Sequence, residues 1–167
     1  MSVEVFIETC REGAIMPRYA NPGDAGMDVY AAEEMIIGPG ETVIVPTGLK
    51  LAIPEGYEIQ VRPRSGLSLK TPIRLPNSPG TIDSGYRDEL GIIVNNSSEA
   101  DLSFNNENPF TLDEKGNKKG TYIIRKGDRI AQIVLQVVPK MKLIPVPSVK
   151  AIGTDRGGGF GSTGISG

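Results

Sequence analysis

The sequence predicts an all-β protein, for three reasons. The 21 glycines and 13 prolines among its 167 residues separate short apolar runs at nearly regular intervals, a pattern typical of sandwiches and barrels. Several of these runs alternate apolar and polar residues, which is the period of a half-buried strand. No long segment shows the 3.6-residue period of a helix. We expect one β domain, because the chain is long enough to bury a substantial core.

The first half of the chain contains five expected strands and one helical turn. The strands are residues 3–8, 27–31, 35–37, 42–45 and 57–62. The last of them alternates most regularly, with Tyr57, Ile59 and Val61 on one face, which indicates that this face is half-buried. After it, Leu67–Lys70 is expected to form a single helical turn that has Ser65 as its N-cap.

The stretch Gly80–Asn96 predicts a β-hairpin. Turn residues precede it, a second turn falls at Ser84-Gly85, and a β-branched run ends it, which is the usual grammar of two paired strands. Asp83 and Tyr86 flank the second turn, so a stiff hairpin would hold an acid and a ring at a fixed separation. Such a unit suits a small planar ligand read by main-chain groups. The alternative is a surface hairpin in which Asp83 makes an Asx-turn and Tyr86 packs locally.

The second half of the chain begins with a polar insert at Ser97–Gly120, interrupted by Phe104 and Phe110. We expect it to leave the sheet as a mobile loop or as a protruding hairpin. The sheet resumes at residues 121–124 and 129–138. Along the last strand the residues expected on one face are Ala131, Ile133, Leu135 and Val137, and those expected on the other are Ile130, Gln132, Val134, Gln136 and Val138.

The end of the chain is expected to leave the domain. Pro139, Pro145 and Pro147 favour an extended segment. The glycine-rich tail after Arg156 has no fixed conformation in isolation, because ordering glycine costs the most backbone entropy. The sequence therefore predicts a β domain over residues 1–143 and an arm with a glycine-rich end over residues 144–167.

Composition excludes several classes of function. The 20 acidic and 18 basic residues nearly cancel, so we expect no nucleic acid and no membrane partner. Cys10 is the single cysteine and the first residues do not resemble a signal peptide, which favours the reducing cytoplasm. Histidine is absent, which removes the commonest general base and metal ligand. Catalysis must therefore rest on carboxylates, hydroxyls, arginine and lysine, or a hard cation.

Two segments have the groups that bind phosphate. In the tail, glycine amides are joined by the Arg156 fork and by the hydroxyls of Ser162 and Thr163, although a plain terminal linker has the same composition. The tripeptide Arg64-Ser65-Gly66 brings a cation and a hydroxyl to the start of the expected helical turn. Its alternative is a surface arginine beside an N-cap. Asp28 either holds a metal-bound water or pairs with an arginine.

In their order along the chain these segments resemble the trimeric dUTPase family. The five blocks that carry the resemblance are Ala25–Ala31, Pro63–Leu67, Gly80–Asn96, Gly127–Gln132 and Arg156–Gly164. The resemblance implies a jelly-roll-like distorted β-barrel with one short helix. It also implies a homotrimer with three shared active sites, in which the C-terminal arm is exchanged between subunits. The glycine-rich end would then close over bound nucleotide as a lid.

The resemblance also implies a role for each site residue. Asp83 matches the general base for the attacking water, and Tyr86 matches the ring beneath the deoxyribose. The contacts to uracil and sugar are Asn77 and the backbone of Thr81, Ile82 and Gly91. The phosphate or water-positioning groups are Arg64, Ser65, Gly66 and Gln132. The lid groups are Arg156, Phe160, Gly161, Ser162 and Thr163. Asp28 matches an acid that supports metal hydration.

The implied reaction is the hydrolysis of dUTP to dUMP and pyrophosphate, by in-line attack of water on the α-phosphorus. Mg²⁺ would travel on the triphosphate and keep most of its own waters. Two alternatives stay open: a dCTP deaminase of the same fold, and a nucleotide sensor that does not hydrolyse its ligand. The insert at residues 97–120 is the expected surface for a protein partner, or else a solvated loop.

Two positions depart from the family pattern. Arg156 and Phe160 are one residue closer together than is usual, which changes the reach of the arginine. Asp88 replaces a frequent glycine in the third block.

Overall fold

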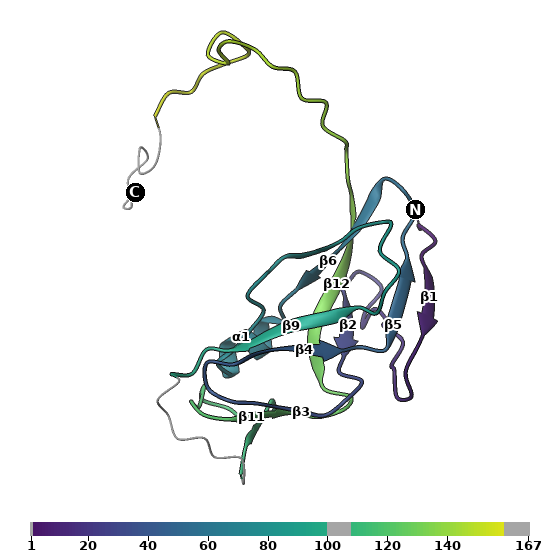
Figure 1. Ribbon diagram of the computed structural model, residues 1–167, viewed down its shortest axis with the longest axis vertical. Helices are drawn as coiled ribbons and strands as arrows, with labels where there is room; N and C mark the ends of the chain where they lie inside the picture. The colour runs from purple at the N-terminus through teal and green to yellow at the C-terminus, as the bar shows by residue number, and fades with distance from the viewer. Residues whose placement is uncertain (1, 100–107, 159–167) are drawn as a thin grey trace.

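The structure is a computed structural model that describes residues 2–99 and 108–158. In this part of the chain nearly all regular structure is β, as the sequence predicts (Figure 1). The strands before the helix are β1 (Phe6–Thr9), β2 (Met27–Tyr30), β3 (Met35–Ile37), β4 (Thr42–Pro46), β5 (Leu49–Ala52) and β6 (Tyr57–Arg62). After helix α1 (Ser65–Lys70) come β7 (Ile73–Arg74), β8 (Gly80–Ile82), β9 (Gly91–Asn96), β10 (Phe110–Thr111), β11 (Tyr122–Ile124) and β12 (Arg129–Val137).

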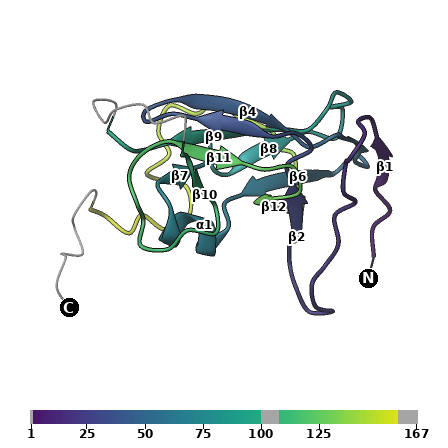
Figure 2. The same ribbon diagram turned by 90° about the horizontal axis from the view of Figure 1, so that it is seen from below.

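These strands form small sheets that face one another. The orders are β2-β12-β6-β8, β4-β9-β7, β10-β11-β3 and β1-β5. Figure 2 shows the layer of β4 and β9 facing the layer of β6 and β12. This is the layered arrangement of a jelly-roll-type subunit.

The core lies between these layers and is mainly aliphatic. Its largest fully buried side chains are Tyr122, Ile37, Leu49, Ile73, Leu90, Ile92, Ile124, Ile130, Val29, Val45 and Val94. Most are β-branched, and they pack well on a pleated surface. Because both β6 and β12 pair on two sides, the ends of these strands are fixed in register.

Strand β12 departs from the alternation that the sequence predicts. A bulge lies between Arg129 and Ala131 where β12 pairs with β2, so both Ile130 and Ala131 are buried. Val137, predicted to share a face with Ala131, is 70% exposed, because the strand runs out of the domain at that end.

The predicted hairpin at Gly80–Asn96 is wrong. Strand β8 pairs with β6, whereas β9 pairs with β4 and β7 in another sheet. The residues between them, Asp83–Leu90, cross from one sheet to the other and are called the crossing segment below. A turn does form within it, since the Tyr86 N–H donates to the Asp83 carbonyl at 3.1 Å. Local turn residues specify such a turn, but not which strand the next one joins.

Helix α1 starts earlier than predicted, and Ser65 is not its N-cap. The N-cap is Arg64, in extended conformation and without a side-chain capping bond. Ser65 is therefore the first helical residue. At the other end Thr71 closes the helix, because its hydroxyl donates to the Leu67 carbonyl at 2.8 Å.

The described part of the insert docks on the domain. Strand β10 pairs parallel to β11, so this part is not a hairpin. The Phe110 ring lies 5.6 Å from the ring of Tyr122, and the Asn117 N–H donates to the Lys70 carbonyl at the end of α1. Phe104 lies outside the described residues.

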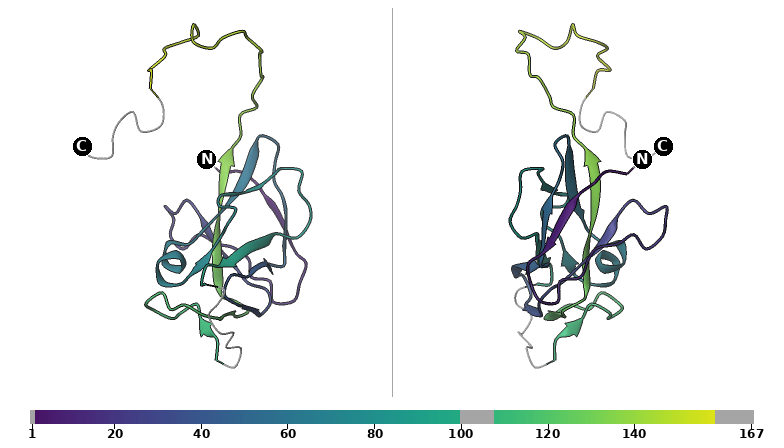
Figure 3. Two further views of the ribbon diagram at one scale, coloured as in Figure 1. Left: turned by 60° about the vertical axis from the view of Figure 1, so that its left-hand side comes forward. Right: turned by 90° about the vertical axis from the view of Figure 1, so that its right-hand side faces the viewer.

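The chain leaves the domain after β12. The Val138 N–H donates to the Gly56 carbonyl at 2.8 Å, and beyond it the arm runs away from the sheets (Figures 1 and 3). Its apolar side chains are largely exposed, among them Met141 (87%), Leu143 (84%), Ile144 (71%) and Val149 (72%). None of the described helices is long and apolar enough to cross a membrane.

Candidate active site

One cluster of predicted site residues is built around Asp28. Arg64 donates from Nε to Asp28 Oδ1 at 2.8 Å, and Arg129 donates from Nη1 to Asp28 Oδ2 at 3.3 Å. Each carboxylate oxygen therefore accepts a hydrogen bond from a different arginine. Of the two roles considered for Asp28, pairing with arginine is the one observed. Two cations share one anion, so the cluster keeps an excess of positive charge.

Strand register places the members of this first cluster. Asp28 on β2 lies opposite Gln132 on β12, and Gln132 lies opposite Arg62 on β6. Arg64 follows β6 and Arg129 begins β12 beside the bulge. The three strands are neighbours in one sheet, so the pairing of their backbones brings the side chains together.

Gln132 is held by the backbone before α1. Its Nε2 donates to the Pro63 carbonyl at 2.8 Å, which leaves its Oε1 free to accept. Gly26 is required beside it, because a Cβ there would lie 2.8 Å from Gln132 Oε1 and 3.2 Å from Val134 Cγ2. A hollow of about 290 Å³ lies against Gly26, Asp28 and Gln132.

A larger polar cavity of about 410 Å³ lies against Arg64. Its lining includes Arg64, Gly66, Lys70, Asp113, Asp128 and Arg129. The two acids already accept hydrogen bonds from Arg125. Asp113 accepts from the Arg125 side chain, and Asp128 accepts from both the side chain and the backbone N–H of Arg125. The three remaining cations give the cavity a surface suited to phosphate. Gly66, which lines the cavity, and the neighbouring Ser65 are both exposed.

A second cluster lies on β8 and the crossing segment. Asp83 and Tyr86 are both exposed there, Tyr86 by 39%. The Tyr86 hydroxyl donates to the Glu89 carbonyl at 2.9 Å, which fixes the orientation of the ring. Asn77 and Thr81 are exposed nearby, whereas Ile82 and Gly91 are half-buried.

The first cluster and the Asp83 end of the second cluster lie at opposite ends of β6. Ile82 pairs with Ile59 in the antiparallel ladder, so Asp83 follows beside Glu58. Arg64 lies six residues further along the chain, which at 3.3 Å per residue is roughly 20 Å away. A single chain therefore does not bring Asp83 to the groups around Asp28 and Gln132.

The predicted lid residues lie apart from both clusters or beyond the described chain. Arg156 is exposed on the arm, which Figure 3 shows extending from the domain. Phe160, Gly161, Ser162 and Thr163 are outside the described residues.

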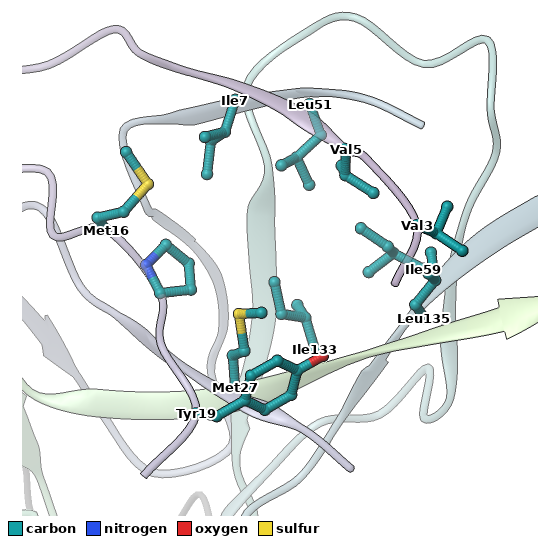
Figure 4. A pocket seen from close by; sticks show the side chains of 11 residues that line it. Val3, Val5, Ile7, Met16, Tyr19, Met27, Leu51, Ile59, Ile133 and Leu135 are labelled. Atoms are coloured by element: carbon teal, nitrogen blue, oxygen red, sulfur yellow. The ribbon is translucent and has the colours of Figure 1, made fainter. Parts of the chain in front are cut away.

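An apolar pocket of about 230 Å³ is not part of either cluster. Figure 4 shows it between the N-terminal segment and β12, with its side chains pointing inward. Its lining is Val3, Val5, Ile7, Met16, Pro17, Tyr19, Met27, Leu51, Ile59, Ile133 and Leu135. The only side-chain oxygen in this set is the Tyr19 hydroxyl. The pocket has no cationic side chain to neutralise a phosphate.

Among residues 2–99 and 108–158 no group of three or more acidic or cysteine side chains could enclose a metal ion. Asp28 is the carboxylate of the first cluster that could contact a hydrated cation. Each of its oxygens accepts one arginine bond and retains acceptor capacity for another donor, such as a metal-bound water.

Sequence reasoning missed several residues that hold the site. Arg129 was part of a recognised block but was given no role, and Lys70 was not considered. Arg11 and Glu89 were also missed: Arg11 Nε donates to both Glu89 oxygens, at 2.7 and 2.8 Å. This bonding holds the pKa of Glu89 below its ordinary value, against the opposing effect of partial burial. Arg11 and Glu89 lie 78 positions apart in the sequence, so no local pattern could have revealed this ion pair.

Comparison with known proteins identifies consistent relatives. A family profile for dUTPase matches residues 12–109. The deoxyuridine 5'-triphosphate nucleotidohydrolase of Syntrophotalea carbinolica is 42% identical, with 98% of this chain and 99% of that protein covered. The structure of Staphylococcus bacteriophage 80alpha dUTPase with dUPNHPP is 32% identical and has a TM-score of 0.86, with 98% and 100% covered. A mutant dUTPase of S. aureus phage phi11, whose structure reveals coordination of a structural Mg(II) ion, is 31% identical, with 87% and 98% covered and a TM-score of 0.79.

Proposed function

The chain belongs to the dUTPase family; on that premise we propose that it hydrolyses dUTP and that its two clusters form one composite active site. The observation that carries the proposal is their separation on β6. The cations suited to phosphate lie at one end of that strand, and the acid with the aromatic ring lies at the other. Two copies of the chain, each supplying one cluster, would complete the site.

The proposed assembly is a homotrimer with exchanged C-terminal arms. The exposed apolar side chains of Met141, Leu143 and Ile144 support it, because an arm that stayed in water would leave this surface unburied. An arm that lies on a neighbouring copy would carry Arg156 and the glycine-rich end to a site made by other chains. Closure of that end over the triphosphate would exclude water from the reaction.

In the proposed mechanism Asp83 is the general base. It accepts a proton from a water molecule as the water oxygen bonds to the α-phosphorus. The bond between the α-phosphorus and the oxygen that bridges to the β-phosphate breaks, and pyrophosphate leaves with that oxygen. Arg64, Ser65 and Gln132 position the phosphates and the water. Such a reaction depends on alignment and charge neutralisation, which the first cluster can provide without histidine.

Selection of the nucleotide is assigned to the second cluster. The Tyr86 ring would lie beneath the deoxyribose and leave no room for a 2'-hydroxyl. Main-chain groups of β8 and β9 would read uracil, because an N–H that faces the uracil O4 would meet an amino group in cytosine. An unpaired buried donor costs about 1–3 kcal/mol. Each such contact would therefore weaken the binding of dCTP relative to dUTP by that amount.

Mg²⁺ is the cofactor that this site would use. The ion would reach the site on the triphosphate, and Asp28 would contact it through a coordinated water. When bound, it would neutralise charge on the phosphates and orient them. Arg64 and Arg129 hold the Asp28 carboxylate in place for that contact.

A pyrophosphate-release assay across dUTP, dCTP, dTTP and UTP tests the proposal. We expect release from dUTP alone. Ammonia release from dCTP would instead identify a deaminase, and binding of dUTP without turnover would identify a sensor.

The composite site has its own test. Arg64→Met and Asp83→Asn each disable one cluster, so each variant alone should be nearly inactive. When the two are unfolded, mixed in equal amounts and refolded, random trimers should recover about a quarter of wild-type activity, because that share of sites combines two intact clusters. Mixing the folded variants without refolding is the control. No recovery after refolding would mean that one chain contains the whole site.

A further inference from the structure

Within the described chain, residues 83–88 of the crossing segment form hydrogen bonds only inside the segment, and its last two residues, Glu89 and Leu90, bond to the rest of the domain. Arg87 donates from Nη1 to the carbonyls of Ser84 and Tyr86, at 2.6 and 2.9 Å. Those bonds, like the turn bond between Tyr86 and Asp83, lie within the segment. They determine its local shape but not where it lies relative to the sheets.

Glu89 is the charged side chain that ties the crossing segment to the rest of the domain. It stands beside the buried Leu90, whose N–H donates to the Leu49 carbonyl at 2.8 Å and whose carbonyl accepts from the Thr47 hydroxyl at 2.6 Å. Arg11 Nε bonds to both Glu89 side-chain oxygens, and the Gly48 N–H donates to Glu89 Oε1 at 2.8 Å. The Glu89 side chain is only 22% exposed. The charged groups around this pair are Glu33, which also bonds to Arg11, and Lys50. An arginine fork against a carboxylate restricts orientation as well as distance.

A chain of hydrogen bonds runs from this ion pair to the proposed general base. The Glu89 carbonyl accepts from the Tyr86 hydroxyl at 2.9 Å. The Tyr86 N–H in turn donates to the Asp83 carbonyl at 3.1 Å. A displacement of Glu89 therefore moves the ring and the acid together.

We propose that Arg11 and Glu89 are positioning residues for dUTP hydrolysis, and that their ion pair sets where Asp83 and Tyr86 lie relative to the neighbouring copy. This inference rests on the proposed function. Arg11 lies outside all five recognised sequence blocks. Because a displacement of about 1 Å can lower a rate by about a hundredfold, the expected effect is on kcat more than on KM.

The experiment compares two exposed cations that pair with carboxylates. Arg11 is 41% exposed and bonds to Glu33 and Glu89, whereas Lys118 in the insert is 51% exposed and bonds to Glu114 at 3.0 Å. Arg11→Met should lower kcat by about tenfold to a hundredfold, while KM stays within about threefold of wild type. Lys118→Met should change neither constant, because Lys118 belongs to neither cluster and its exposed ion pair contributes little. Arg11→Lys should recover part of the loss, since it keeps the charge but not the fork.

Each result decides the matter. If the wild type does not hydrolyse dUTP, the proposed function fails and this inference fails with it. If the wild type is active, and Arg11→Met retains its kcat although the Gly48 amide resonance shows that the ion pair is broken, only the positioning role is overturned. An equal fall in kcat in Arg11→Met and Lys118→Met also overturns it. Should Arg11→Met not fold, Arg11→Lys is judged by the same criteria.

Discussion

The two clusters are held in place by different means. The first lies where β2, β6 and β12 pair side by side, so backbone register alone brings Asp28, Arg64 and Gln132 together. The second lies on a segment that crosses between sheets and is held at its end by the buried Leu90 and by one long-range ion pair. In a sheet, backbone pairing alone positions a residue. In a crossing segment, the position depends on contacts of particular residues with the rest of the domain. Substitutions should therefore act differently in the two regions.

The largest expected effect is at the acid of the second cluster. Asp83→Asn should lower kcat by ~10²–10⁴-fold, because it removes the proton acceptor from the attacking water. Binding of a non-hydrolysable dUTP analogue should be unchanged, since the amide is nearly the same size. Single-turnover kinetics and calorimetric titration would measure both quantities. Turnover like that of the wild type would remove Asp83 from its role.

A smaller loss is expected in the first cluster from Gly26→Ala. The added methyl group would lie 2.8 Å from Gln132 Oε1, so the amide must turn away from its present position. We expect kcat/KM to fall by about tenfold to a hundredfold, through misplacement of the water or the α-phosphate. Gly23→Ala is the control, because a Cβ at that position has no neighbour within 4 Å. Equal activity of the two variants would contradict the role given to Gln132.

The stability that the Glu89–Arg11 ion pair contributes should decrease at acid pH. The pKa of Glu89 is lowered chiefly by its bond from Arg11, so its charged form stabilises the fold at neutral pH and this contribution disappears as pH falls through the folded pKa. Glu89→Gln should be less stable than the wild type by about 1–3 kcal/mol at pH 7. The difference should begin to shrink near the ordinary value of 4.5. Denaturant unfolding at several pH values measures it, and a constant difference down to pH 2 would exclude this origin.

The smallest effect is expected at the ring. Tyr86→Phe removes only the hydroxyl that donates to the Glu89 carbonyl, a bond worth about 0.5–1.5 kcal/mol. We expect a fall of a few-fold in kcat/KM for dUTP. The preference for dUTP over UTP should persist because the ring remains. A large gain in UTP hydrolysis would show that the hydroxyl, and not the ring, excludes ribose.

The difference between the regions also explains what the sequence could predict. Alternation and punctuation by glycine and proline located most of the strands, because each is a local property. Bringing Asp28 and Arg64 together needed the pairing of β2, β6 and β12, which are distant in sequence. The hairpin prediction was wrong for the same reason, because it also depended on which distant strands pair. The turn after Asp83 was correct, but β9 joins β4 because its buried Ile92 and Val94 fit that layer.

Local patterns also misjudged some details within elements. Ser65 has a good capping side chain, yet Arg64 is the N-cap, because its backbone is extended and its side chain bonds to Asp28. The bulge in β12 shifted the alternation at Ile130. The roles of Asp83 and Tyr86 came from resemblance to a family, since an exposed acid and ring three residues apart have no local signature of catalysis.

The roughly 20 Å between Arg64 and the position of Asp83 beside Glu58 has a consequence for newly made protein. If the site needs two copies, a newly folded chain is inactive until it associates with other copies. Activity after refolding should then appear with a lag that lengthens as the protein is diluted, whereas spectroscopic signals of the β structure should return at a rate independent of dilution. The cell would thus gain this hydrolase only above a threshold of its own abundance.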